Sequence, residues 1–238
     1  MFGFDINYND TTMRYLVANW KAYKTNEQAI TWMDSFTSLL STNETVQQNL
    51  NNDGLAIIIA PSYLVLGEIK DKLKSVSNNK NIYLAAQDVA SVDRENVTGD
   101  VTVEQLKDIV EFIIVGHSEH RALHNETEKE IQEKIELVHD NGLKSILCIS
   151  KAEQFLAQAD LIAYEPIEAI GSGKNASNEE ILQFRHSLPQ NFQKPFLYGG
   201  SVSLADVDEY LQVEDINGFL VATHSLDPQE FIQIAERL

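Results

Sequence analysis

Three polar segments, each directly after a short apolar run, carry side chains that could do chemistry. Asn19-Trp20-Lys21 supplies an amide and an ammonium, Gly116-His117-Ser118-Glu119 an imidazole and a carboxylate, and Glu165-Pro166 a second carboxylate. A carboxylate can abstract a carbon-bound proton, while an imidazole and an ammonium can polarise a carbonyl and stabilise the enediolate that forms. The set therefore suits proton transfer next to the carbonyl of a small anionic substrate.

Two glycine-containing segments add candidate anion-binding backbone. Residues 169–174 (AIGSGK) follow Glu165-Pro166, and Gly199-Gly200-Ser201 follows another apolar run. Glycine lets backbone N–H groups approach a phosphate closely. The nucleotide-loop pattern G-x-x-x-x-G-K-[ST] does not occur, which leaves NTP binding without support. Each feature alone has a structural alternative, such as a surface charge or a turn glycine, so the argument depends on their joint occurrence at strand ends.

Eight short apolar runs, each followed by a segment of helical period, are the elements that would position these groups. This alternation predicts βα units and a parallel sheet. A single-domain (β/α)8 barrel is the favoured α/β fold, and a doubly wound open sheet is the alternative, because strand count alone does not show closure. In a barrel, all the polar segments would meet at the C-terminal ends of the strands. The predicted strands are Tyr15–Ala18, Leu55–Ala60, Ile82–Ala86, Phe112–Val115, Ser145–Ile149, Leu161–Tyr164, Phe196–Tyr198 and Gly218–Val221.

Capping residues mark the predicted helices between the strands. Asn125 with Glu128 resembles a capping box that opens a helix, and Asn141-Gly142 ends it. The other predicted helix starts are Ser177 with Glu180, and Asp227-Pro228 with Glu230.

Two stretches depart from the repeat. Residues 1–12 are polar and rich in Asn and Asp, so we expect a mobile N-terminal tail, a barrel domain over residues 13–238, and Met13 as an alternative start. The interval between Cys148 and Glu165 is short, so we expect the fifth βα unit to be shortened. Its helix must fit within residues 151–158, roughly two turns.

Composition excludes several classes of function. The chain has 238 residues, 36 acidic and 18 basic, and a formal net charge of −18 at pH 7. Nucleic-acid binding and docking on anionic membranes are not expected, because both depend on clustered Lys and Arg. The single cysteine, Cys148, excludes an internal disulfide framework and a thiolate metal cluster.

The expected location is the cytoplasm. The first residues contain neither the basic nor the apolar region of a signal peptide, and no apolar run approaches the ~18 residues of a membrane span. No metal is assigned, because the remaining histidines show no metal-type spacing with acidic or cysteine partners. These histidines are His120, His124, His139, His186 and His224.

Seven segments, in this order, resemble the triosephosphate isomerase family over residues 14–238. The resemblance implies a (β/α)8 TIM barrel and the interconversion of dihydroxyacetone phosphate and glyceraldehyde 3-phosphate without a cofactor. By the same resemblance, Glu165 would be the base, His117 the neutral electrophile and Lys21 the balancing cation, which are the roles that these groups have in the family as a whole. The segments are Asn19-Trp20-Lys21, Ala85-Ala86-Gln87-Asp88, Val115-Gly116-His117-Ser118-Glu119, Ala163-Tyr164-Glu165-Pro166, Ala169-Ile170-Gly171-Ser172-Gly173-Lys174, Tyr198-Gly199-Gly200-Ser201-Val202 and Gly218-Phe219-Leu220-Val221.

The resemblance also assigns supporting roles. Asn19 would contact the substrate oxygens, and Glu119 would support the site through Lys21 or a neighbouring group. Gly171 and Ser201 would hold the phosphate by backbone N–H groups, and residues 166–174 would form a lid that excludes water, as is general for the family. It further implies a homodimer, with a tetramer as the alternative, in which residues 89–101 enter the partner's site.

Four residues depart from the family pattern. Ala222 and Thr223 stand where two glycines usually receive the phosphate, and Glu168 stands where an aromatic residue is common. His120 replaces a usual arginine, so we expect an ion pair that braces the segment after the third strand to be missing. These departures keep two alternatives open: a non-catalytic barrel that binds or assembles, and an isomerase of another phosphorylated sugar.

Overall fold

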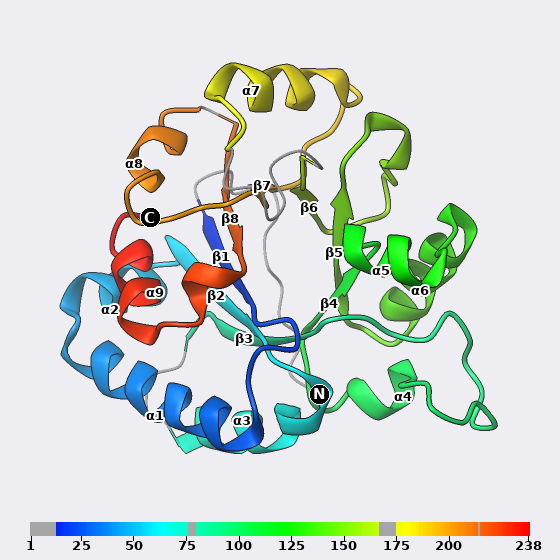
Figure 1. Cartoon of the computed structure of the whole chain (residues 1–238), viewed down its shortest axis with the longest axis horizontal. Coiled ribbons are helices and arrows are strands. Elements are labelled where there is room, and N and C mark those ends of the chain that lie inside the picture. The colour runs from blue at the N-terminus through cyan, green and yellow to red at the C-terminus, as the bar shows by residue number, and fades with distance from the viewer. Residues whose placement is uncertain (1–12, 76–79, 167–174, 214) are drawn as a thin grey trace.

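The strands form a closed parallel barrel (Figure 1). The computed structural model describes residues 13–75, 80–166, 175–213 and 215–238. Neighbouring strands pair in chain order, and the last pairs back with the first. This closure excludes the open-sheet alternative and confirms the predicted barrel. The strands are β1 (Arg14–Asn19), β2 (Leu55–Ala60), β3 (Ile82–Ala86), β4 (Phe112–Val115), β5 (Lys144–Ile149), β6 (Leu161–Tyr164), β7 (Phe196–Tyr198) and β8 (Gly218–Val221).

All eight predicted strands are confirmed, and two of them extend beyond their apolar run. Arg14 and Asn19 are added at the ends of β1, and Lys144 at the start of β5. The barrel register pairs Arg14 with Leu55 and Asn19 with Ala60. Polar side chains can join a strand at its ends because the ladder is made by backbone groups.

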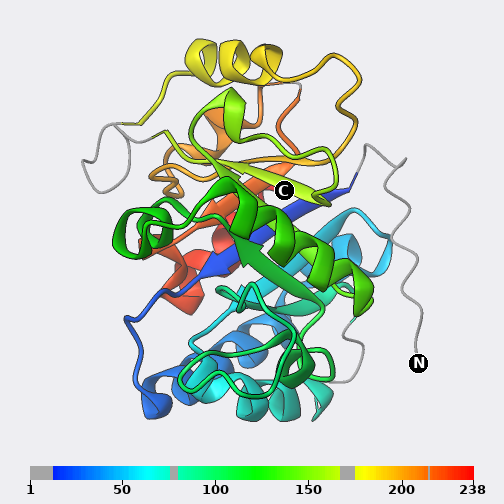
Figure 2. The same cartoon turned by 90° about the vertical axis from the view of Figure 1, so that its right-hand side faces the viewer.

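Helices surround the barrel, and Figure 2 shows α6 in front of the strands in the view turned by 90°. The α-helices are α1 (Asn26–Thr42), α2 (Glu44–Asn51), α3 (Leu66–Ser75), α4 (Val103–Leu106), α5 (Ser118–His124), α6 (Glu128–Asp140), α7 (Asn178–Ser187), α8 (Val207–Tyr210) and α9 (Pro228–Ala235). Single 3-10 turns are η1 (Tyr63–Val65), η2 (Ala152–Gln154) and η3 (Thr223–Ser225). Among the described residues, no helix combines the length and the hydropathy needed to cross a membrane.

The strands are buried on both faces. In β1, Tyr15 and Val17 belong to a cluster made of strand residues alone, which fills the barrel. Leu16 and Ala18 belong to a second cluster, which includes helix residues such as Trp32 of α1. Successive side chains of a strand point to opposite faces. The alternation therefore explains why these strands read as continuous apolar runs in the sequence.

One predicted helix start is wrong by two residues. The capping box of α6 is formed by Thr127 and Glu130, not by Asn125 and Glu128. Asn125 instead ends α5, with a φ of 54° in the left-handed region that Asn tolerates. The predicted starts at Ser177 and at Asp227-Pro228, and the predicted end at Asn141-Gly142, are confirmed.

The fifth unit contains no α-helix of two turns, so that expectation is wrong. Between β5 and β6 the described chain forms only the 3-10 turn η2. The Gln154 amide oxygen accepts hydrogen bonds from the backbone N–H groups of Ser150 and Lys151, and this local arrangement replaces helical bonds. The predicted tail, residues 1–12, lies outside the described residues.

Candidate active site

Polar side chains from three places in the sequence, after β1, β4 and β6, meet at the C-terminal ends of the strands. Asn19 ends β1, His117 follows β4 and Glu165 follows β6, and all three are buried. Lys21 lies two residues beyond Asn19 and reaches Glu119 on α5, with Nζ 2.6 Å from Oε1. The barrel closure brings these groups together even though up to about 150 positions separate them in the chain.

Glu165 is the most enclosed of these groups, with only 2% of its surface exposed. Its Oε1 lies 2.8 Å from Nε2 of His117, and its Oε2 accepts the backbone N–H of Ser118 at 3.1 Å. Burial opposes the charged carboxylate, but the His117 ring and the Ser118 N–H outweigh it and lower the pKa of Glu165. The structure therefore holds Glu165 as a buried carboxylate, charged and able to accept a proton.

His117 is oriented by the start of α5. It is the N-cap residue, and its Nδ1 accepts the backbone N–H of Glu119 at 3.2 Å. A ring with one proton must then carry it on Nε2, the nitrogen that faces Glu165. Burial disfavours the imidazolium, but the nearby Glu165 carboxylate outweighs it and raises the pKa of His117.

Lys21 adopts a backbone conformation that is rare for lysine. Its φ is 48°, in the left-handed region. Two amide side chains hold this turn: the Lys21 N–H donates to Oδ1 of Asn19 at 3.1 Å, and Nε2 of Gln87 donates to the Lys21 carbonyl at 2.9 Å. Such strain persists only where surrounding contacts fix it, and here it aims the ammonium at the mouth of the barrel.

Two glycines leave room for this arrangement. Gly116, before His117, has a φ of 68°, and a Cβ there would lie 2.8 Å from a guanidinium nitrogen of Arg121. That guanidinium donates from Nε to the Gly116 carbonyl at 2.6 Å. A Cβ on Gly199 would lie 3.1 Å from Cγ of Glu165. A glycine thus lies next to each member of the His117–Glu165 pair.

Comparison with known proteins agrees with this geometry. A family model described as triosephosphate isomerase matches residues 14–238.

The chain belongs to the triosephosphate isomerase family.

Curated relatives cover almost the whole chain. The triosephosphate isomerase of Mycoplasmoides gallisepticum is 34% identical, over 94% of this chain and 97% of that protein. That of Mycoplasma pneumoniae is 34% identical over 94% and 98%, and that of Thermodesulfovibrio yellowstonii is 31% identical over the same shares. The resemblance stated from the sequence motifs is confirmed by these matches.

The residues that replace the family's glycine pair do not adopt a positive φ. Ser201 follows β7, and Ala222 and Thr223 follow β8, which pairs with β7. Ala222 has a φ of −96°, and Thr223 has no positive φ. Neither residue therefore adopts the left-handed φ that favours glycine. Gly171, Glu168 and the rest of the lid segment from residue 167 to 174 lie outside the described residues.

The motifs of the triosephosphate isomerase family assigned no role to two groups that the structure brings to the site. Gln87 also donates to the carbonyl of Ala60 at 2.9 Å, so it joins the ends of β1, β2 and β3. The available signal for Gln87 was a polar residue directly after a buried strand, and His117 likewise follows β4 after one glycine. The Ser118 N–H had no signal in residue type, because any residue other than proline supplies one.

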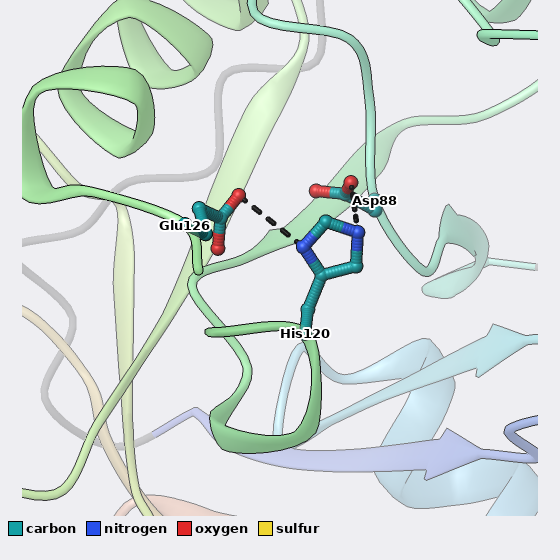
Figure 3. Close-up of side chains that lie close together, drawn as sticks. All are labelled: Asp88, His120 and Glu126. Carbon is teal, nitrogen blue, oxygen red and sulfur yellow. Dashed lines mark ion pairs between the residues drawn. The ribbon is translucent and has the colours of Figure 1, made fainter. Parts of the chain in front are cut away.

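His120 makes the bracing contact that was expected to be missing from this member of the triosephosphate isomerase family, and the contact is an ion pair when the ring is protonated. Its Nε2 lies 3.0 Å from Oδ2 of Asp88 and its Nδ1 lies 3.5 Å from Oε1 of Glu126 (Figure 3). An imidazole is shorter than an arginine, but α5 brings it close enough to the segment after β3. The expectation of a missing brace is therefore wrong.

The same three side chains form a grouping that sequence spacing did not reveal. Ligand-type atoms of Asp88, His120 and Glu126 lie within 4.8 Å of one another. The ammonium of Lys134 already contacts both carboxylates, with Nζ 2.7 Å from Oδ1 of Asp88. The protein thus supplies its own cation to this cluster, and a metal would have to displace a buried ammonium.

Proposed function

We propose that this chain interconverts dihydroxyacetone phosphate and D-glyceraldehyde 3-phosphate through an enediolate, as an aldose–ketose isomerase that needs no cofactor. The observation that carries the proposal is the buried Glu165–His117 pair, 2.8 Å between Oε1 and Nε2, beside Lys21 at the strand ends. Membership in the family supports the choice of substrate. The pathway we propose for the reaction is glycolysis and gluconeogenesis, in the cytoplasm.

Glu165 is the base of the proposed mechanism. The substrate displaces the His117–Glu165 contact, and the freed carboxylate takes a proton from the carbon next to the carbonyl. The electron pair left behind forms the enediolate. The hydroxyl proton of the first carbon passes to the former carbonyl oxygen, and the protonated Glu165 returns its proton to the former carbonyl carbon. In the free protein the contact with His117 lowers the pKa of Glu165 and keeps it ionised. Once the substrate has displaced that contact, burial raises the pKa of the carboxylate, which strengthens it as a base, and excludes competing water.

His117 and Lys21 stabilise the oxygen charge. With Nδ1 engaged by the Glu119 N–H, the Nε2–H of His117 is the donor available to the substrate oxygen. The Lys21 ammonium, paired with Glu119, balances the negative charge that develops, and Asn19 contacts the substrate oxygens. Glu119 acts as a support because its backbone orients His117 and its carboxylate holds Lys21.

The phosphate is assigned to backbone N–H groups at Gly171, Ser201, Ala222 and Thr223. Support comes from the adjacent placement of β7 and β8, whose ends carry three of these residues. A chain with a net charge of −18 repels a dianion at long range, so attraction must be local, from Lys21 and backbone dipoles.

A homodimer is the proposed assembly, with a tetramer as the alternative. A cavity of about 800 Å³ opens beside Asn19, Lys21 and His117 and is walled by much of the segment after β3. Leu123, which lines this cavity, is 77% exposed, and Leu64, the residue after the lining Tyr63, is 80% exposed. Exposed apolar side chains around a cavity suit a second copy of this chain. Sedimentation of the purified protein measures its oligomeric state, and a monomer at all concentrations would contradict the proposed dimer.

A coupled isomerase assay on the purified protein tests the activity. We expect turnover of both triose phosphates and none of unphosphorylated dihydroxyacetone, the matched control. A folded protein without turnover above buffer would refute the proposal. Calorimetry with phosphoglycolate then distinguishes the isomerase, which should bind this compound, from a non-catalytic barrel, which would not. A panel of substrates would reveal an isomerase of another phosphorylated sugar.

A further inference from the structure

The imidazole of His120 connects three segments of the chain. His120 lies on α5, Asp88 follows β3, and Glu126 lies in the turn between α5 and α6. Figure 3 shows the ring between the two carboxylates, with a different nitrogen toward each. A neutral imidazole has one N–H, and the contact with Asp88 uses it. The buried Nδ1 has no hydrogen-bond partner among the described residues, so protonation there places a positive charge 3.5 Å from Oε1 of Glu126.

We propose that His120 is a positioning residue for the reaction: its protonated ring ties α5 to the segment after β3, and the tie weakens as the pH rises. The inference rests on the proposed function, because the groups that it positions are those of the isomerase site.

Charge balance favours the protonated ring. Asp88 and Glu126 are two carboxylates, and Lys134 supplies one ammonium to both. The Glu126 side chain is only 3% exposed, and its Oε2 has no hydrogen-bond partner among the described residues. An uncompensated charge in such a place is costly. A protonated His120 brings the four groups to neutrality, and a neutral one leaves a net charge of −1.

The other groups around the ring do not reverse this balance. His124 of α5 stacks on His120 at 4.3 Å between ring centres, and the Tyr63 hydroxyl donates to the Asp88 carbonyl at 2.5 Å. Glu130 of α6 lines the same cavity. The hydrogen bond to Asp88 is the main cause that raises the pKa of His120 above its ordinary 6.5, while burial and Lys134 oppose it. The charged brace is therefore complete below the ordinary value and weakens as the pH rises through the raised pKa of His120.

Both ends of the brace adjoin residues that hold the site. His120 follows Glu119, which orients His117 and pairs with Lys21. Asp88 follows Gln87, which donates to the Lys21 carbonyl. A looser connection between α5 and the segment after β3 would let Glu119 and Gln87, the two residues that hold Lys21, move relative to each other. We expect the loss in kcat, since the substrate-oxygen contacts matter most in the transition state.

The test compares wild type with His120→Arg, which keeps a cation at every pH, and with His120→Gln, which has none. His186→Arg on the exposed face of α7 is the matched charge control. For each protein, kcat, KM and Tm are measured from about pH 6 to about pH 9, spanning the imidazole range. The same series is repeated with EDTA.

We expect the kcat ratio of wild type to His120→Arg to fall about threefold to tenfold across this range, the effect of weakening one hydrogen bond, because the neutral ring can still donate to Asp88. His120→Gln should stay low throughout, His186→Arg should follow wild type, and the Tm difference between wild type and His120→Arg should grow in parallel.

Parallel pH profiles of wild type and His120→Arg in both kcat and Tm would overturn the inference. A difference that EDTA abolishes would assign the cluster to a metal and would also overturn it. Absence of turnover in every protein, with the pH-dependent Tm difference intact, would refute the proposed function and the role in positioning, and would support the brace alone.

Discussion

Replacing Glu165 with glutamine removes the proposed base and keeps the shape of its side chain. An amide does not accept a proton near neutral pH, so the variant loses proton transfer itself. A positioned general base contributes about 10²- to 10⁴-fold to the rate. We therefore expect kcat to fall by about 10³-fold or more, which corresponds to roughly 4 kcal/mol of activation free energy.

The fold should survive this substitution. The Glu165 carboxylate accepts hydrogen bonds from His117 and from the Ser118 N–H. Glutamine turns its amide nitrogen toward one of these donors and loses one charged hydrogen bond, which costs about 1.5–3 kcal/mol. Removal of a buried charge offsets this by an amount of similar size. The free energy of unfolding should thus change by less than about 2 kcal/mol, a Tm shift of several degrees.

Glu165→Asp separates chemistry from position. Aspartate keeps the carboxylate but withdraws it by about 1.5 Å, one carbon–carbon bond. A misplacement of about 1 Å can cost about 10²-fold in rate. We expect Glu165→Asp to lose about 10²-fold, less than Glu165→Gln.

The coupled assay, with circular dichroism to monitor folding, measures all three proteins. Glu153→Gln is the control, because Glu153 is exposed on η2 and does not line the cavity beside Lys21 and His117. Full activity in folded Glu165→Gln would remove Glu165 from the role of base. A collapse of Tm in Glu165→Gln but not in Glu165→Asp would show that the carboxylate stabilises the barrel, contrary to the offset argued above.

Three further changes test other parts of the structure. Gly199→Ala places a Cβ 3.1 Å from Cγ of Glu165, so the Glu165 side chain must move by a few tenths of an ångström. We expect kcat to fall by about threefold to tenfold with little change in KM. An unchanged kcat would mean that the site tolerates this shift. Lys21→Met should lower kcat/KM by about 10²-fold or more in the same assay, since it removes the ammonium of the site, and an unchanged value would exclude that role. Partial burial opposes the charge of Asp160, yet its contacts with His139 and nearby donors lower its pKa. Its contribution to stability is therefore present at neutral pH and is lost as the pH falls through the lowered pKa. In urea unfolding, acidification should lower the free energy of unfolding less in Asp160→Asn than in wild type.

The strands were predictable from sequence because each is buried on both faces. Such burial demands a continuous apolar run, and β2, β3, β4, β6, β7 and β8 have the bounds that their runs predicted. Helix starts were less certain where two capping patterns overlap. At α6, Asn125 and Thr127 both fit the pattern, and the left-handed turn that ends α5 selects Thr127.

The sequence by itself determined which groups could do the chemistry. Glu165, His117, Lys21 and Asn19 were identified by their types and by their positions after apolar runs, which in a parallel barrel all end on one face. Membership in the triosephosphate isomerase family follows from the same segments.

Only the tertiary structure decided how these groups meet. The contact between His117 and Glu165, the turn of Lys21 held by Gln87, and the ring of His120 between two carboxylates each join segments that lie far apart in the chain. Their distances depend on closure of the barrel and on the packing of α5. No local pattern encodes them, because hydrogen bonds and ion pairs between segments are set by where the backbone places each side chain.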